Sequence, residues 1–233
     1  AIPNSMTPGR YFSASRLFTY FGKYNRDIIR DDAQLNKSYG FIDHENLKTR
    51  IIFLNTSDFS DYDVVTRPDT GNIYTHNAGV PMSSNYNYFM GLEQIKWFIS
   101  KLDMSDKVDA VDWQIIVMSH MALDQWAMIN TGYAEILNAY ENGTSVTIKN
   151  YSYDFNGKNA AKLALYIHGH THSYIVDNHY HKDGSAYKRM RLARICVPNA
   201  LPGRETQPNE ADYNGIVIGT DNAYAKTYRS KDD

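Results

Sequence analysis

Three short apolar runs, at residues 50–54, 113–118 and 163–167, constrain the fold of this chain more than any other feature of its sequence. Continuous apolar runs of this length are typical of strands that are buried on both faces of a sheet. Residues 91–102 carry apolar side chains at helical spacing and predict an amphipathic helix between the first two runs. The order of these elements predicts an α/β fold.

The remaining extended segments alternate with polar stretches. A strand at 39–42 precedes the first apolar run, a short helix is predicted at 133–140, and a polar connection follows that helix. The last third of the chain is predicted to be mostly β, with extended runs at 173–176, 189–197, 216–219 and 223–228. No internal repeat and no low-complexity linker divides the sequence, so we expect residues 1–233 to form a single domain.

The composition excludes several classes of protein. A formal net charge of −2 argues against a dedicated nucleic-acid binder, which would carry a basic stripe. No apolar stretch reaches the length of a membrane span and no signal peptide is visible, which favours the cytoplasm and predicts no membrane partner. The single cysteine, Cys196, excludes an internal disulfide and lies in an apolar run, so it is interpreted as a buried thiol.

One basic cluster alternates with apolar residues late in the chain. We interpret it as a solvated face of a strand rather than a phosphate-binding patch. Its members are Lys188, Arg189, Arg191 and Arg194.

Histidines follow two of the apolar runs at the point where each strand should end. His120 comes just after the second run, and His170 and His172 come just after the third. If the two strands are neighbours, the three imidazoles converge at the carboxyl edge of the sheet, where ligands collect in α/β proteins. Two residues apart in an extended segment, His170 and His172 would point the same way, with Gly169 allowing a tight turn or a close backbone approach. Three convergent imidazoles predict a transition-metal site.

The other histidines have structural interpretations. A single histidine at a strand end is most often a hydrogen-bonded surface or core residue, and His168 should face away from the site and pack. The alternating pair His179 and His181 is interpreted as part of a solvated turn. His44 and His76 are loop residues without a visible partner.

The sequence Ile-His-Gly-His-Thr-His-Ser at 167–173 resembles the Gly-His-x-His signature of calcineurin-like metallophosphoesterases. The run that ends in His120 is similar to the preceding histidine motif of that family, although Met121 and Ala122 replace the proline that commonly follows. The segments 39–54, 91–98 and 216–228 resemble a strand pair, a helix and the last hairpin of the same family.

This resemblance implies a two-sheet β-sandwich flanked by helices and a site with two divalent metal ions, Mn, Fe or Zn. The histidines matching His120 and His170 would bind one metal, and the one matching His172 would bind the other. In the family a hydroxide that bridges the metals hydrolyses phosphate monoesters or diesters, so the expected partner is a phosphate-ester substrate.

The first three motifs of the family, Asp-x-His, Gly-Asp-x-x-Asp and Gly-Asn-His, should precede residue 38, and none of them occurs there. They supply the carboxylate ligands and the general acid, so we expect the chain to be the C-terminal part of the fold, with the N-terminal strands missing and no catalytic residue of its own. Alone, it should bind at most one metal weakly and show little activity. Exposed edges predict pairing with the missing N-terminal segment or with a second copy.

Two other functions remain open. In the first, the chain keeps the fold as a non-catalytic binding or structural module of a larger assembly. Alternatively, the three histidines hold one metal in a mononuclear hydrolase or lyase, for which Asp124 is the nearest candidate base in the sequence. In either case, the polar loop at 55–90 is expected to lie at the surface beside the site.

Overall fold

The computed structural model describes residues 39–56, 58, 64–66, 73–75, 90–129, 131–171, 173–197, 211–218 and 223–230. Most of the predicted loop at 55–90 lies outside this part of the chain. Within it are two short strands that pair with each other, β3 (Val64–Thr66) and β4 (Ile73–Thr75).

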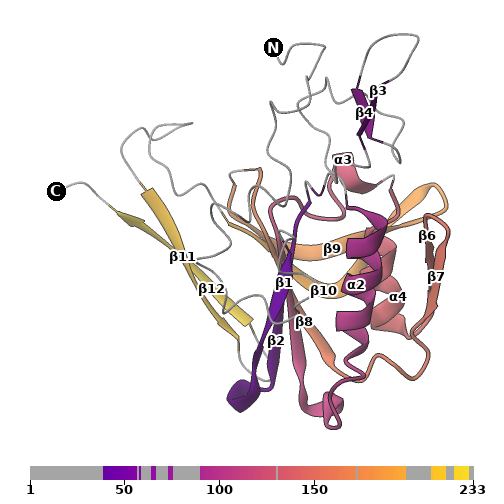
Figure 1. Cartoon of the computed structure of the whole chain (residues 1–233). Coiled ribbons are helices and arrows are strands. Elements are labelled where there is room, and N and C mark those ends of the chain that lie inside the picture. The colour runs from indigo at the N-terminus through magenta and orange to yellow at the C-terminus, as the bar shows by residue number, and fades with distance from the viewer. Residues whose placement is uncertain are drawn as a thin grey trace.

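A six-stranded mixed sheet organises the described residues (Figure 1). Its strand order is β1-β2-β5-β8-β10-β9, and the four central strands β2, β5, β8 and β10 run parallel, while β1 and β9 are antiparallel edges. The strands are β1 (Gly40–His44), β2 (Thr49–Leu54), β5 (Gln114–Ser119), β8 (Lys162–His168), β9 (Ile175–Asp183) and β10 (Ala186–Cys196). The predicted α/β class is confirmed, and the three apolar runs form adjacent parallel strands.

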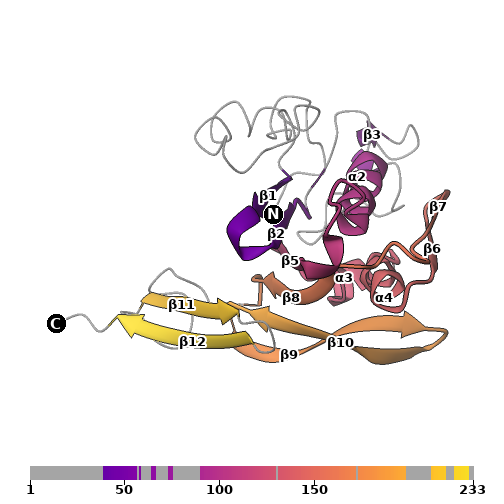
Figure 2. The same cartoon turned by 90° about the horizontal axis from the view of Figure 1, so that it is seen from below.

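Apolar side chains cover both faces of the central strands, as parallel strands require. Alternate residues divide between two clusters, since Ile115 and Val117 of β5 belong to the larger one and Ile116 belongs to the smaller one. The larger cluster also contains the apolar faces of helices α2 (Leu92–Asp103) and α4 (Ala134–Asn142). Both helices therefore lie on the same face of the sheet (Figure 2).

Each of these helices ends at a residue in the left-handed region of backbone conformation. Helix α2 ends where Met104 enters the left-handed region, with φ of 49°. Helix α4 ends at Gly143, whose φ is 61° and whose amide donates to Tyr140 O. A Cβ at position 143 would lie only 3.1 Å from Asn159 Nδ2, so glycine is favoured there both by backbone conformation and by space.

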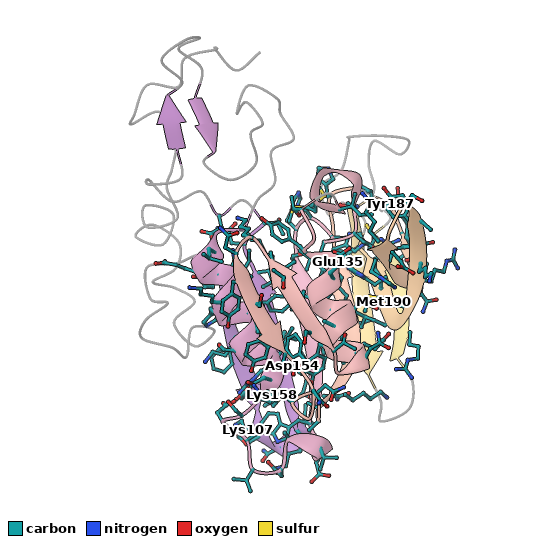
Figure 3. The ribbon with its side chains drawn as sticks, turned by 90° about the vertical axis from the view of Figure 1, so that its right-hand side faces the viewer. Lys107, Glu135, Asp154, Lys158, Tyr187 and Met190 are labelled. Carbon is teal, nitrogen blue, oxygen red and sulfur yellow. The ribbon has the colours of Figure 1, made fainter. Side chains whose placement is uncertain are left out.

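The polar connection predicted after α4 is wrong in part, because it contains a β-hairpin. Strands β6 (Ser145–Ile148) and β7 (Tyr151–Asp154) pair antiparallel through a two-residue turn in which Lys149 has φ of 51°. Val146 and Ile148 are buried, and Tyr151 and Tyr153 pack against the same core. Figure 3 shows the outer side of this region, with Asp154 and Lys158 close together at the end of the hairpin.

Short elements complete the described chain. They are the single-turn helix α3 (Trp126–Ile129), the 3-10 turns η3 (Glu45–Leu47) and η4 (Ala110–Asp112), and the hairpin of β11 (Ala211–Ile218) and β12 (Ala223–Ser230). Strands β11 and β12 form a two-stranded sheet separate from the main one. Among the described residues, the helices are too short or too polar to cross a bilayer.

A buried arginine holds the end of the sheet where the parallel strands begin. The side chain of Arg50 is fully buried and donates to both carboxylate oxygens of Asp43, to Asp106 and to the carbonyl of Lys101. Lys107 joins the network by pairing with Asp43, and it lies at the end of the molecule away from Tyr187 (Figure 3). These charges are structural, because the predicted site lies at the opposite ends of the same strands.

Candidate metal centre at the carboxyl ends of β5 and β8

The carboxyl ends of the parallel strands form one row across the sheet. The registers place Leu54 opposite Ser119, Ser119 opposite His168, and His168 opposite Cys196. His120 directly follows β5, and His170 comes two residues after the end of β8. The expectation that the two histidine-bearing strands are neighbours is therefore correct.

The side chains of His120 and His170 meet. Nδ1 of His170 lies 3.3 Å from Nε2 of His120, and the two rings are nearly perpendicular at 84°. Two nitrogens that each lie about 2.0–2.1 Å from a tetrahedral metal are about 3.3–3.4 Å apart, so this separation fits two ligands of one ion. The same separation also allows one neutral ring to donate an N–H to the other. His120 is exposed and His170 half-buried, so solvent reaches the pair.

A strained turn presents His170. The amide of Thr171 donates to the carbonyl of Gly169 at 3.0 Å, which closes a three-residue γ-turn centred on His170, and the φ of His170 is +72°. A residue other than glycine in this region stores strain of about 1–3 kcal/mol. The prediction of an extended segment at 170–172 is wrong at His170 for this reason.

Of the two roles predicted for Gly169, the close backbone approach is confirmed and the tight turn is not. Its own φ is not in the left-handed region, and an added Cβ would meet only ordinary contacts, at 3.9 Å from His120. The backbone does come close to the neighbouring strand end, because the amide of Gly169 donates to the carbonyl of His120 at 3.0 Å. This bond joins the two loops that carry the histidines, while the sharp turn itself falls on His170.

Hydrogen-bond donors from three residues converge on the Gly169 carbonyl. Besides Thr171 N–H, it accepts from Nδ1 of His168 at 3.0 Å and from the thiol of Cys196 at 3.3 Å. The Thr171 hydroxyl lies 3.0 Å from the same sulfur. Burial lowers the pKa of His168, and the carbonyl fixes its neutral form with the proton on Nδ1. The predictions that His168 packs and that Cys196 is buried are confirmed.

Hydroxyl groups hold the loop that carries His120. The hydroxyl of Tyr166 lies 2.6 Å from Ser119 Oγ and accepts the amide of Leu123 at 3.1 Å. The amide of Met121 donates to the hydroxyl of Thr56 at 3.2 Å. Burial raises the pKa of Tyr166, so this hydroxyl stays protonated and keeps its role in the network. Sequence reasoning missed Tyr166 because it reads as one residue of an apolar strand.

Asp124, the candidate base of the mononuclear alternative, is buried and bonded to Arg194 and to the amide of Tyr180. Its side chain is fully buried, accepts Nη1 of Arg194 at 2.7 Å and the amide of Tyr180 at 2.7 Å. Burial raises the pKa of Asp124, and the charge of Arg194 acts against that rise. Asp124 thus anchors the loop after β5 to strands β9 and β10.

Two predictions of solvated side chains are wrong. Arg194 is buried to about nine-tenths and forms a two-pronged pair with Asp177 in addition to its bond with Asp124. His179 is fully buried, and burial lowers its pKa to about 3. Neither ring nitrogen of His179 has a hydrogen-bond partner among the described residues. Lys188, Arg189 and Arg191 are exposed, as predicted.

The third predicted ligand, His172, lies outside the described residues, as does His76. His44 ends β1 at the far end of the sheet, so it is not part of the centre. Within the part of the chain that the structure describes, no three His, Cys, Asp or Glu side chains are grouped closely enough to hold a metal ion. The described site is therefore a pair of histidines rather than a complete coordination shell.

Comparison with known proteins adds no relative: no protein-family model and no curated protein matches the sequence. The case for a function therefore depends on the residues and their geometry.

Proposed function

We propose that this chain supplies histidine ligands to a metal-dependent phosphoesterase site. The main observation behind this proposal is that His170 Nδ1 lies 3.3 Å from His120 Nε2, at the carboxyl ends of adjacent parallel strands. The Gly-His-x-His sequence at 169–172 supports the same function, with His172 as a further ligand. On this proposal the six-stranded sheet is one layer of a two-sheet sandwich of the metallophosphoesterase type.

The chain's own residues would hold and orient the metal. His120 and His170 present nitrogens at the spacing of two ligands, and the backbone bond between Gly169 and His120 keeps their loops together. Divalent ions such as Mn, Fe or Zn, when bound, would activate water and stabilise the charge that develops on a phosphate ester. Among the described residues, no carboxylate joins the two histidines in a group of three ligands, so the other ligands would come from outside those residues, His172 included.

Metal titration tests the proposal. Calorimetry and the visible spectrum of Co²⁺ added to the purified chain should show one ion bound, and His120→Ala and His170→Ala should each weaken binding at least tenfold. His44→Ala is the matched control, since His44 lies at the other end of the sheet. Equal binding by the wild-type chain and both site variants would refute the assignment of ligands.

Hydrolysis of a phosphate ester separates this function from its alternative. Turnover of bis-p-nitrophenyl phosphate with Mn²⁺ should be weak for residues 1–233. If the natural gene encodes residues ahead of Ala1, the longer product should bind two ions and turn over faster. A longer product that binds no second ion and shows no turnover would instead favour a non-catalytic binding or structural module.

A further inference from the structure

We propose that Cys196 and Thr171 are positioning residues that hold His170 in its ligand-presenting turn, an inference that rests on the proposed metal site. Neither would touch a metal. They act through the Gly169 carbonyl, the acceptor that closes the γ-turn around His170.

The direction of each hydrogen bond follows from its partners. The Gly169 carbonyl can only accept, so the Cys196 thiol donates its proton to it. With that proton used, the sulfur is an acceptor for the Thr171 hydroxyl at 3.0 Å. The Thr171 hydroxyl therefore donates to the Cys196 thiol, and the thiol donates to the Gly169 carbonyl. The amide of Thr171 donates to this same carbonyl, so the hydrogen bonds form a closed ring, which we call the relay. The relay therefore ties both ends of the turn to β10.

The tertiary setting fixes the Cys196 end of this relay, whereas Thr171 is exposed. Cys196 is fully buried and lies opposite His168 in the parallel register of β8 and β10. The amide of Val197 donates to the carbonyl of His168 at 2.7 Å, which fixes the strand end beside the turn. His168 adds its Nδ1–H to the same Gly169 carbonyl. Groups outside a ligand shell that orient a ligand in this way commonly change metal affinity by 10–100-fold when they are removed.

Paired substitutions separate this role from simple packing. Cys196→Ala and Thr171→Val remove the hydrogen-bonding group, whereas Cys196→Ser and Thr171→Ser keep one. We expect about tenfold weaker Co²⁺ binding for the first pair and affinity within about threefold of wild type for the second. Ser173→Ala is the control, because Ser173 Oγ donates to the carbonyl of Thr171 and not to that of Gly169.

Alanine and serine both shrink the side chain at position 196, so loss of packing would affect the two variants alike. The inference would be overturned if Cys196→Ala and Cys196→Ser weakened Co²⁺ binding equally. It would also be overturned if Cys196→Ala or Thr171→Val left Co²⁺ binding unchanged.

A second measurement does not need the metal. In the metal-free chain, the NMR amide resonance of Thr171 reports the turn, and its hydrogen exchange should be at least tenfold faster in Cys196→Ala and Thr171→Val than in the serine variants. If the wild-type chain binds no Co²⁺, the proposed function fails while the exchange result still decides whether the relay holds the turn. Unchanged exchange in all four variants would refute the relay by itself.

Discussion

Replacing Asp124 with asparagine should destabilise the protein more than any single loss at its surface. Asp124→Asn keeps the shape of the side chain but removes the charge that faces Arg194, and it places an NH₂ group against either Arg194 or the amide of Tyr180. Each of these hydrogen bonds to a charged group contributes about 1.5–3 kcal/mol. Because Arg194 keeps its two bonds to Asp177, part of the loss is offset, and we expect the free energy of unfolding to fall by about 3 kcal/mol.

Urea unfolding at pH 7.5, followed by far-UV circular dichroism and tryptophan fluorescence, measures this difference. In thermal unfolding, the same loss of about 3 kcal/mol should lower the melting temperature by about 6–12 °C for a chain of this size. Asp177→Asn is the matched control, since Asp177 bonds the same guanidinium but its side chain is 22% exposed. It should cost about 1 kcal/mol. A loss below 1 kcal/mol for Asp124→Asn, or a larger loss for Asp177→Asn, would refute the view that burial makes the Asp124 contacts decisive.

Three further predictions use the same unfolding assay. His170→Gly should be more stable than His170→Ala by about 1 kcal/mol. Glycine relieves the strain at φ of +72°, and this gain is larger than the loss from its more flexible unfolded chain. Equal stability of the two variants would argue against a strained turn. His179 binds a proton only in the unfolded chain between its ordinary pKa of 6.5 and its folded value of about 3, so stability should fall by about 2 kcal/mol from pH 7 to pH 5 on its account. His179→Leu should lose that part of the pH dependence, and an unchanged slope would contradict it. Arg50→Met should lower the free energy of unfolding by about 3–5 kcal/mol, because Asp43 and Asp106 lose their buried partner. Arg50→Lys should recover only part of this loss, since lysine lacks the planar guanidinium group. Full recovery by lysine would contradict this reasoning.

The alternation of side chains along β10 could have predicted that Arg194 is buried. Arg194 lies two residues after Leu192 and four after Met190, and both of these are buried on the helix-covered face. Alternation alone therefore places Arg194 on the buried side. Composition pointed the other way, because an arginine among other cations reads as a surface residue. The cost of burying this charge is offset by Asp177 and Asp124, which lie 17 and 70 residues away in the sequence.

The hairpin of β6 and β7 was missed for a related reason. Its buried residues Val146 and Ile148 alternate with polar ones over only four positions, too few to stand out from a polar connection. Its stability comes from Tyr151 and Tyr153 packing against the main core, which is a tertiary contact.

The sequence by itself determined the central strands, the helix α2 and the side of the sheet where histidines gather. Apolar runs become buried in any compact fold, and parallel strands bring their carboxyl ends to one edge of the sheet. The tertiary structure decided the surroundings of His170, because the carbonyl that closes its γ-turn accepts a hydrogen bond from Cys196 on another strand, 27 residues from Gly169 in the sequence. Local pattern predicts which residues reach the edge of a sheet, but the backbone torsions of a strained turn follow from contacts that form only after the strands have paired.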